Sequence, residues 1–337
     1  MLDKPTIQDA DLIRFLHDQY GLDIADIVFL PIGADSHAAV YQVMTTDKTP
    51  YFLKLKRGNF DTMTVQIPHL IRENQISQVI APQLTQAKQL SAQYKEFHVI
   101  LYPYVDGQDA YTRHLSPHHW QTLGRALRGI HTINIPPEIQ SRLRRENFTS
   151  YWRDIVTAYM ARIQQEQPQN PLESELATLL NTNRRVVDDL VHTAHKFGAI
   201  LQNQPLEFVL CHGDIHAWNI LIDEQGQLFI VDWDDAILAP KERDLMFIGA
   251  GIGGIWDKPE EHAWFFDGYG QVNIHHSALA YYRNERIVQD IAVTILDITS
   301  DTHSIDNKHL MLQQLAGQFA PNSRLITIAK KTAQLVE

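Results

Sequence analysis

The sequence predicts an α+β protein with two lobes, a small strand-rich lobe followed by a larger, mainly helical lobe. Three observations support this prediction. Short runs rich in β-branched and aromatic residues, at 27–30, 38–43 and 51–56, dominate the first hundred residues. Apolar residues at helical spacing dominate the rest of the chain. A single strand-like hairpin, at residues 220–231, interrupts those helices.

The first lobe is expected to begin with a helix and continue with strands. Apolar residues at helical spacing predict a helix over residues 7–20, and Gly21 is a signal for its C-terminus. After the three strands, a helix is expected over residues 65–73, with Pro68 interrupting it. A further strand is expected over residues 98–105.

The second half is expected to be built from long helices. Ser116 followed by Pro117 is typical of a helix start, with an N-cap and a proline in the first turn. The other helices expected here cover residues 151–163, 174–201, 275–296 and 309–332. The joint between the lobes is expected near residues 102–107. The predicted domains are therefore residues 1–103, which would bind a nucleotide, and residues 104–337, which would carry catalysis and substrate binding.

Charge and composition narrow the class of partner. The 337-residue chain has a net charge of −11, which argues against general binding to nucleic acids or anionic membranes and is compatible with a cationic substrate. Its one cysteine, Cys211, excludes an internal disulfide. The chain starts without a signal-peptide pattern, so we expect a cytoplasmic protein, acting as a monomer or homodimer.

The segment 209–221 holds the most informative motif. An apolar run leads into His212, Gly213 and Asp214, Asn219 follows five residues later, and the next strand-like run ends on Asp232. Phosphoryl transfer from ATP needs a carboxylate beside the acceptor hydroxyl and oxygen ligands for Mg²⁺. Asp214 suits the first role, whereas Asn219 and Asp232 suit the second. A hairpin between Asn219 and Asp232 would bring both to one ion.

Other segments supply the remaining parts of a kinase site. Lys54 and Lys56 lie on one face of the third strand, so geometry leaves both open as the phosphate-binding lysine. Lys54 fits the kinase pattern better because it ends an apolar triplet. The backbone from Gly33, together with Ser36, could cradle phosphates. No helix carboxylate stands out as the partner of the lysine.

Two further roles follow from the layout, which is that of a protein-kinase-like fold. Adenine would be recognised by backbone groups of Pro103, Tyr104 and Val105, where the chain passes between lobes. Asp244 is expected to anchor the catalytic loop rather than to contact substrate.

The residues quoted above resemble the aminoglycoside phosphotransferases and related small-molecule kinases, such as choline kinases. Outside the motif, the resemblance extends to residues 51–56, 238–249, 268–270 and 281–293. It implies an ATP- and Mg²⁺-dependent kinase that phosphorylates a hydroxyl of an aminocyclitol or aminoglycoside antibiotic. It assigns Asp214, Asn219, Asp232 and Lys54 the roles given above.

The acceptor is the least determined part of the prediction. Candidate carboxylates for holding a cationic ligand are Asp234, Asp235, Glu285 and Asp290. Two alternatives stay open: a housekeeping kinase of an amino alcohol or sugar, and a nucleotide-binding pseudoenzyme. The presence of Asp214, Asn219 and Asp232 argues against the pseudoenzyme.

Overall fold

Contacts divide the chain into two compact units. The computed structural model describes residues 4–31, 38–300, 304–321 and 323–336. Unit 1 comprises Met1–Leu143 with Ala217–Ala236, and unit 2 comprises Arg144–His216 with Ile237–Glu337.

A five-stranded antiparallel sheet forms the first part of unit 1. Its strand order is β1-β2-β3-β5-β4. The strands are β1 (Ile24–Leu30), β2 (Ala38–Thr45), β3 (Pro50–Arg57), β4 (Ala92–Tyr94) and β5 (Phe97–Pro103). The central strand β3 alternates buried leucines with the partly exposed Lys54 and Lys56, so both lysines lie on the same face.

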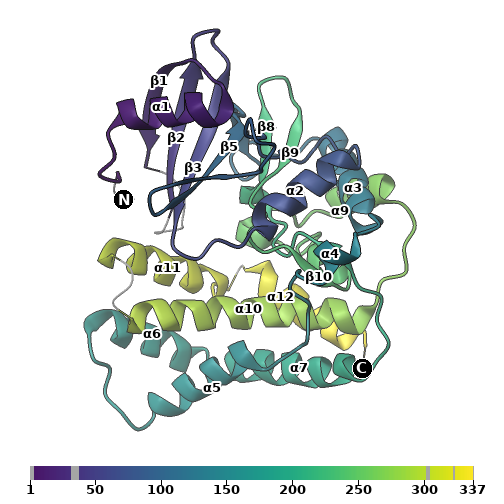
Figure 1. The fold of residues 1–337 in the computed structure, drawn as a ribbon. Coiled ribbons are helices and arrows are strands. Elements are labelled where there is room, and N and C mark those ends of the chain that lie inside the picture. Colours follow the sequence, from purple (N-terminus) through teal and green to yellow (C-terminus); the bar gives the residue numbers. More distant parts are fainter. Residues whose placement is uncertain (1–3, 32–37, 301–303, 322, 337) are drawn as a thin grey trace. The chain divides into compact units, whose positions relative to one another are not determined.

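Helix α1 (Asp9–Tyr20) lies against this sheet and closes its core (Figure 1). Leu12 and Leu16 are fully buried and cluster with inward-facing strand residues such as Tyr41 and Leu53. Gly21 ends the helix in the left-handed conformation, with φ of 69°, as the sequence predicted.

The rest of unit 1 combines short helices with a three-stranded sheet of order β6-β8-β9. The strands are β6 (Gly107–Asp109), β8 (Ile220–Asp223) and β9 (Leu228–Ile230), and the short 3-10 helix η1 (Ala217–Asn219) precedes β8. Strand β9 also contacts the first part of unit 1, because the amide of Ile230 donates to the carbonyl of Gln78 (2.7 Å). The helices are α2 (Met63–Glu73), α3 (Pro117–His131) and α4 (Pro137–Gln140).

Unit 2 is organised around one long buried helix. Helix α10 (His276–Thr299) packs against α5, α7, α11 and α12, which surround it in Figure 1. These helices are α5 (Tyr151–Arg162), α7 (Arg184–Gln202), α11 (Ile305–Gln318) and α12 (Arg324–Gln334). Unit 2 also contains α6 (Pro171–Thr182), α8 (Glu242–Leu245), η2 (Ile252–Gly254), α9 (Pro259–Tyr269) and the strand pair β7 (Val209–Cys211) and β10 (Ile237–Ala239).

The predicted fold class is confirmed: an antiparallel sheet comes first and helices dominate the remainder. Three helix predictions differ from the structure. Helix α2 continues through Pro68, which is buried within it. The expected helix 174–201 is two helices, because Asn183 leaves helical geometry (φ −102°, ψ 16°). The expected helix 309–332 is also two, with Pro321 between them.

The contact-based units do not coincide with the predicted division at residue 103. Residues 104–143 and the segment 217–236 belong with the N-terminal sheet. The reason is strand pairing: β6 pairs with β8, and Val79 forms a bridge with Ile230. The division into a nucleotide-binding and a catalytic lobe stays a prediction. Among the described residues, no helix has the length and apolar character needed to cross a membrane.

Candidate active site

The hairpin of unit 1 brings Asn219 and Asp232 together as predicted. Strand β8 begins directly after Asn219, and β9 ends two residues before Asp232. The ladder pairs Ile220 with Ile230, and beyond it the amide of Val231 donates to the carbonyl of Asn219 (3.0 Å). The two candidate ligands therefore flank the open end of one hairpin.

The local chemistry at this end suits a small divalent cation. An amide oxygen from Asn219 and a carboxylate from Asp232 are hard donors of the kind that Mg²⁺ takes, with water completing its shell. Asp232 has a φ of 66°, in the left-handed region that residues other than glycine seldom adopt. Such conformations persist where the surrounding structure imposes them, and they concentrate at functional sites. The residues present therefore fit the ion.

The two strand lysines converge on one carboxylate. The Lys54 ammonium lies 3.3 Å from the Asp234 carboxylate, and the Lys56 ammonium lies 3.6 Å from the same oxygen. Both lysine side chains are about one-fifth exposed, and Asp234 is 36% exposed. The partner that the sequence left open is thus Asp234, two residues after the candidate metal ligand Asp232.

Helix α2 offers no competing partner for the lysine. Its Glu73 is mostly exposed and lies 3.4 Å from His69, one turn earlier in the same helix. Asp61 accepts the backbone amide of Met63 (2.9 Å) and so belongs to the start of that helix. Asp234 was also a candidate for holding substrate; the structure shows its carboxylate paired with the two lysines, and the substrate role stays a prediction.

Tyr102, at the end of β5, belongs to the same charged region. Burial raises the pKa of its phenol above the usual range, and the charges of Asp234 and Asp232 raise it further. The hydroxyl therefore stays protonated and is able to donate a hydrogen bond beside two carboxylates. Sequence reasoning missed this residue because it reads as an ordinary strand tyrosine.

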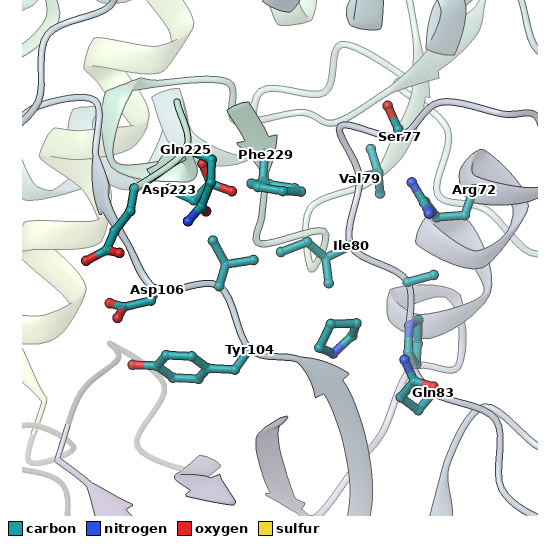
Figure 2. Close-up of a pocket in the computed structure, with 15 residues that line it drawn as sticks. Arg72, Ser77, Val79, Ile80, Gln83, Tyr104, Asp106, Asp223, Gln225 and Phe229 are labelled. Atoms are coloured by element: carbon teal, nitrogen blue, oxygen red, sulfur yellow. The ribbon is translucent and has the colours of Figure 1, made fainter. Parts of the chain in front are cut away.

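The segment expected to recognise adenine lines a pocket of about 530 Å³ in unit 1. In Figure 2, Asp106, Asp223 and Gln225 lie at one end, Arg72 and Ser77 at the other, with Phe229 between them. Further lining residues are Pro103, Tyr104 and Val105. The lining does not include the hairpin ligands or the strand lysines, so the pocket lies apart from the expected phosphate chemistry. Gly33 and Ser36, the predicted phosphate-cradling residues, fall outside the described residues.

In unit 2, the loop that carries Asp214 is fixed by Asp244, as predicted. The Asp244 carboxylate accepts the backbone amides of His212 (2.9 Å) and Gly213 (2.8 Å), and all three residues are buried. Arg243 donates to the carbonyl of Gly213 (2.9 Å). Gly213 has a φ of 91°, which a side chain would strain, and this explains the glycine between His212 and Asp214.

Both carboxylate oxygens of Asp214 have cationic or imidazole partners. Arg286, on helix α10, donates to one oxygen, and the ring of His216 lies 3.2 Å from the other. Burial is the largest influence on the pKa of Asp214 and raises it, but Arg286, His216 and His212 together hold the pKa well below its usual range. Asp214 is therefore a carboxylate at any physiological pH. It suits orienting a hydroxyl better than storing a proton.

The other three candidate substrate carboxylates have different surroundings. Glu285 is 3% exposed and lies 3.2 Å from the Arg153 guanidinium, so its carboxylate is buried in an ion pair between α10 and α5. Asp290 accepts from Arg286 (2.9 Å) and from Gln318 on α11 (2.8 Å). Asp235 is exposed, in unit 1.

Two aromatic residues of unit 1 flank the hairpin entry. Trp218, directly before Asn219, stacks on Tyr111 with ring centroids 4.7 Å apart and planes 18° from parallel. Each is 42% exposed.

Comparisons with known proteins identify the family of this chain. The model of the phosphotransferase enzyme family (APH) matches residues 28–282. The crystal structure of spectinomycin phosphotransferase APH(9)-Ia in complex with ADP and spectinomycin is 37% identical. The match has a TM-score of 0.90 and covers 98% of this chain and 100% of that chain. The AMP-bound structure of that protein is 35% identical, with a TM-score of 0.86 and coverage of 96% and 98%.

A more distant structure shows the shared fold. An aminoglycoside phosphotransferase from Alicyclobacillus acidocaldarius is 17% identical, with a TM-score of 0.64 over 99% of this chain and 98% of that chain. The family match spans most of the sequence and contains Lys54, Asp214, Asn219 and Asp232. The chain therefore belongs to the APH phosphotransferase enzyme family, and it is a small-molecule kinase.

Proposed function

We propose that this protein transfers the γ-phosphoryl group of ATP, with Mg²⁺, to a hydroxyl of an aminocyclitol antibiotic, and that the acceptor is spectinomycin. One observation carries the choice of acceptor: the match to a spectinomycin phosphotransferase, in complex with ADP and spectinomycin, at 37% identity over nearly the whole of both chains. A match to a single shared motif would leave the acceptor open, because many kinases share the motif.

In this proposal Asp214 is the catalytic residue. Its carboxylate accepts a hydrogen bond from the acceptor hydroxyl and aims the oxygen at the phosphorus. It accepts the proton only as the new bond forms, because its low pKa makes it a weak base. Most of the rate enhancement then comes from positioning and from stabilising charge on the transferred group.

The groups of unit 1 act on the nucleotide. Lys54 pairs with phosphate oxygens, and Asp234 positions its ammonium group; Lys56 contributes a second positive charge on the same face. Asn219 and Asp232 would hold Mg²⁺, which supplies charge neutralisation to the phosphates when bound. Gly33 and Ser36 would also contact the phosphates.

Adenine recognition is proposed for the backbone of Pro103, Tyr104 and Val105. The Tyr104 amide already donates to the Pro50 carbonyl (3.3 Å) at the edge of the sheet. Proline has no amide hydrogen. The donor within this segment is therefore assigned to Val105.

The acceptor molecule is proposed to be cationic, in keeping with the protein's net charge of −11. Of the four carboxylates considered from the sequence, Asp235 is proposed for an amine contact because its side chain is exposed, whereas that of Glu285 is buried. The exposed pair of Trp218 and Tyr111 offers a flat surface that an amine-bearing ring could cover. We place the enzyme in the cytoplasm, where ATP is available.

The test is ATP consumption by the purified protein with Mg²⁺, across aminocyclitol antibiotics, aminoglycosides, choline, ethanolamine and homoserine. Asp214→Asn serves as the blank, and mass spectrometry of the product identifies the phosphorylated compound. Turnover on spectinomycin alone supports the proposal. Turnover only on a metabolite alcohol would keep the mechanism and replace the acceptor. Binding of Mg-ATP without turnover on the whole panel would contradict the proposal and favour a nucleotide-binding pseudoenzyme.

A further inference from the structure

Arg286 contacts the candidate catalytic carboxylate from a different element of unit 2. Its guanidinium donates to one oxygen of Asp214 and, through Nε, to Asp290 (2.9 Å), which lies one helical turn further along α10. Asp290 in turn accepts from the Gln318 amide on α11 (2.8 Å). A continuous chain of hydrogen bonds thus runs from α11 through α10 to Asp214.

The carboxylates of Asp214 and Asp290 are both stabilised by the positive charge of Arg286. Its side chain is 17% exposed and that of Asp214 20%, so both charges are largely removed from water. The titratable and charged groups around Asp214 include Arg286 and Asp290 of α10, His212 and His216 of its own loop, and Arg243 and Asp244 of α8. Asp214 and Asp290 both accept from the Arg286 guanidinium, and a largely buried carboxylate that loses a cationic partner is costly.

We propose that Arg286 is a positioning residue for the phosphotransfer reaction: it holds the Asp214 carboxylate in one orientation and keeps it ionised, and Asp290 holds Arg286 in place. This inference rests on the proposed function and extends it to a residue to which the sequence assigned no role. A planar guanidinium suits the task because it donates to two carboxylates at once in fixed directions, which an ammonium group does not.

The electrostatics of Asp214 agree with that assignment. Burial alone would raise the pKa of Asp214 above its usual value, and the opposing cation is chiefly Arg286. Asp290 and Asp214 in turn raise the pKa of Arg286 against the effect of its own burial. Without Arg286, only His216 and His212 would oppose the effect of burial, so the pKa of Asp214 should rise.

The decisive experiment compares kcat from pH 5 to pH 9, with saturating ATP and acceptor, in the wild type, Arg286→Gln and Arg286→Lys. For Arg286→Gln we expect kcat about 10–10²-fold lower at pH 7.5, in line with the cost of a misplaced catalytic group. Its activity relative to wild type should fall a further severalfold towards pH 5. Arg286→Lys should restore the pH profile, since it keeps the charge, but only part of kcat. The KM for ATP should stay within about twofold, because the nucleotide groups lie elsewhere in the chain.

Arg184→Gln is the matched control. Arg184 also pairs with an aspartate four residues later, Asp188, but both side chains are well exposed. Its replacement should leave kcat and the pH profile unchanged. Asp290→Asn gives an independent test that does not remove the guanidinium. It should lower kcat by less than Arg286→Gln does. The fall of kcat towards pH 5 should also be closer to that of the wild type.

Thermal unfolding tests the contact between Arg286 and Asp214 without requiring any enzymatic turnover. Melting temperatures of the wild type, Arg286→Gln, Asp214→Asn and the double variant at pH 7.5 should be non-additive, by about 2–4 °C. If the wild type phosphorylates nothing on the panel, the proposed function fails. The non-additivity of the melting temperatures still tests whether Arg286 and Asp214 interact. Additive melting temperatures, or a folded Arg286→Gln protein with wild-type kcat and pH profile, would overturn the positioning role.

Discussion

Replacing Asp234 with asparagine tests how the phosphate-binding lysine is positioned. The carboxylate lies 3.3 Å from the Lys54 ammonium and 3.6 Å from that of Lys56, so one substitution removes both ion pairs. The pairs are neither fully exposed nor buried, which places their combined contribution at about 1 kcal/mol, near the upper end for surface pairs. Because 1.4 kcal/mol corresponds to a tenfold change, we expect the KM for Mg-ATP to rise about fivefold. We expect kcat to change by less than threefold.

The measurement is steady-state kinetics with ATP varied at saturating acceptor and Mg²⁺, for wild type, Asp234→Asn and Asp234→Glu. The glutamate variant should recover part of the affinity, because it restores the charge with a longer reach. Asp47→Asn is a suitable control, since Asp47 is an exposed turn residue that accepts the amide of Thr49 (3.2 Å). A KM for ATP below that of the wild type would refute the reasoning. It would mean that Asp234 competes with the phosphates for the lysines instead of positioning them.

Three further predictions follow from the structure. Asp214→Asn should lower kcat by about 10²–10⁴-fold with nearly unchanged nucleotide affinity, which turnover and nucleotide titration would check; full activity would exclude the assigned role. Asp232→Ala should chiefly weaken Mg-ATP binding, seen as a higher Mg²⁺ requirement in titrations, and an unchanged requirement would contradict the ligand assignment. Burial raises the pKa of Glu285 to about 7, so the folded protein retains a proton that the unfolded chain releases. Stability from this group should therefore be present below about pH 4.5 and decline by at most about 3 kcal/mol towards pH 7. Urea unfolding of wild type and Glu285→Gln at pH 5–8 checks it, and a pH-independent difference between them would contradict it.

Several features of the fold could be read from local sequence because their causes are local. Gly21 ends α1, Ser116 caps α3 through the His119 amide (3.2 Å), and the turn at Gly226 closes the β8–β9 hairpin. Each depends on residues within a few positions of one another. The boundaries that were wrong lie at Pro68, Asn183 and Pro321, and of these only Pro321 is itself a local signal for a helix end. A break between two helices with similar apolar faces leaves little trace in their periodicity.

In the candidate site, too, some features could be predicted from the sequence and others could not. The order and spacing of Lys54, Asp214, Asn219 and Asp232 determined the reaction class, because phosphotransfer needs those side chains and the hairpin brings two of them together. The anchoring of the Asp214 loop by Asp244 also followed from the sequence. The partners of these groups did not. Asp234 reaches β3 from 180 residues away in the chain, and Arg286 reaches Asp214 from 72 residues away.

The sequence by itself determined the chemistry, since the residue types and their short spacings set what the site can do. Only the tertiary structure decided which cation each candidate carboxylate pairs with. Asp234, Glu285 and Asp290 look alike in the sequence, yet they pair with the strand lysines, with Arg153 and with Arg286, respectively. The physical reason is that the role of a charge depends on its burial and its nearest opposite charge. Both are set by segments distant in the chain, which the fold brings together.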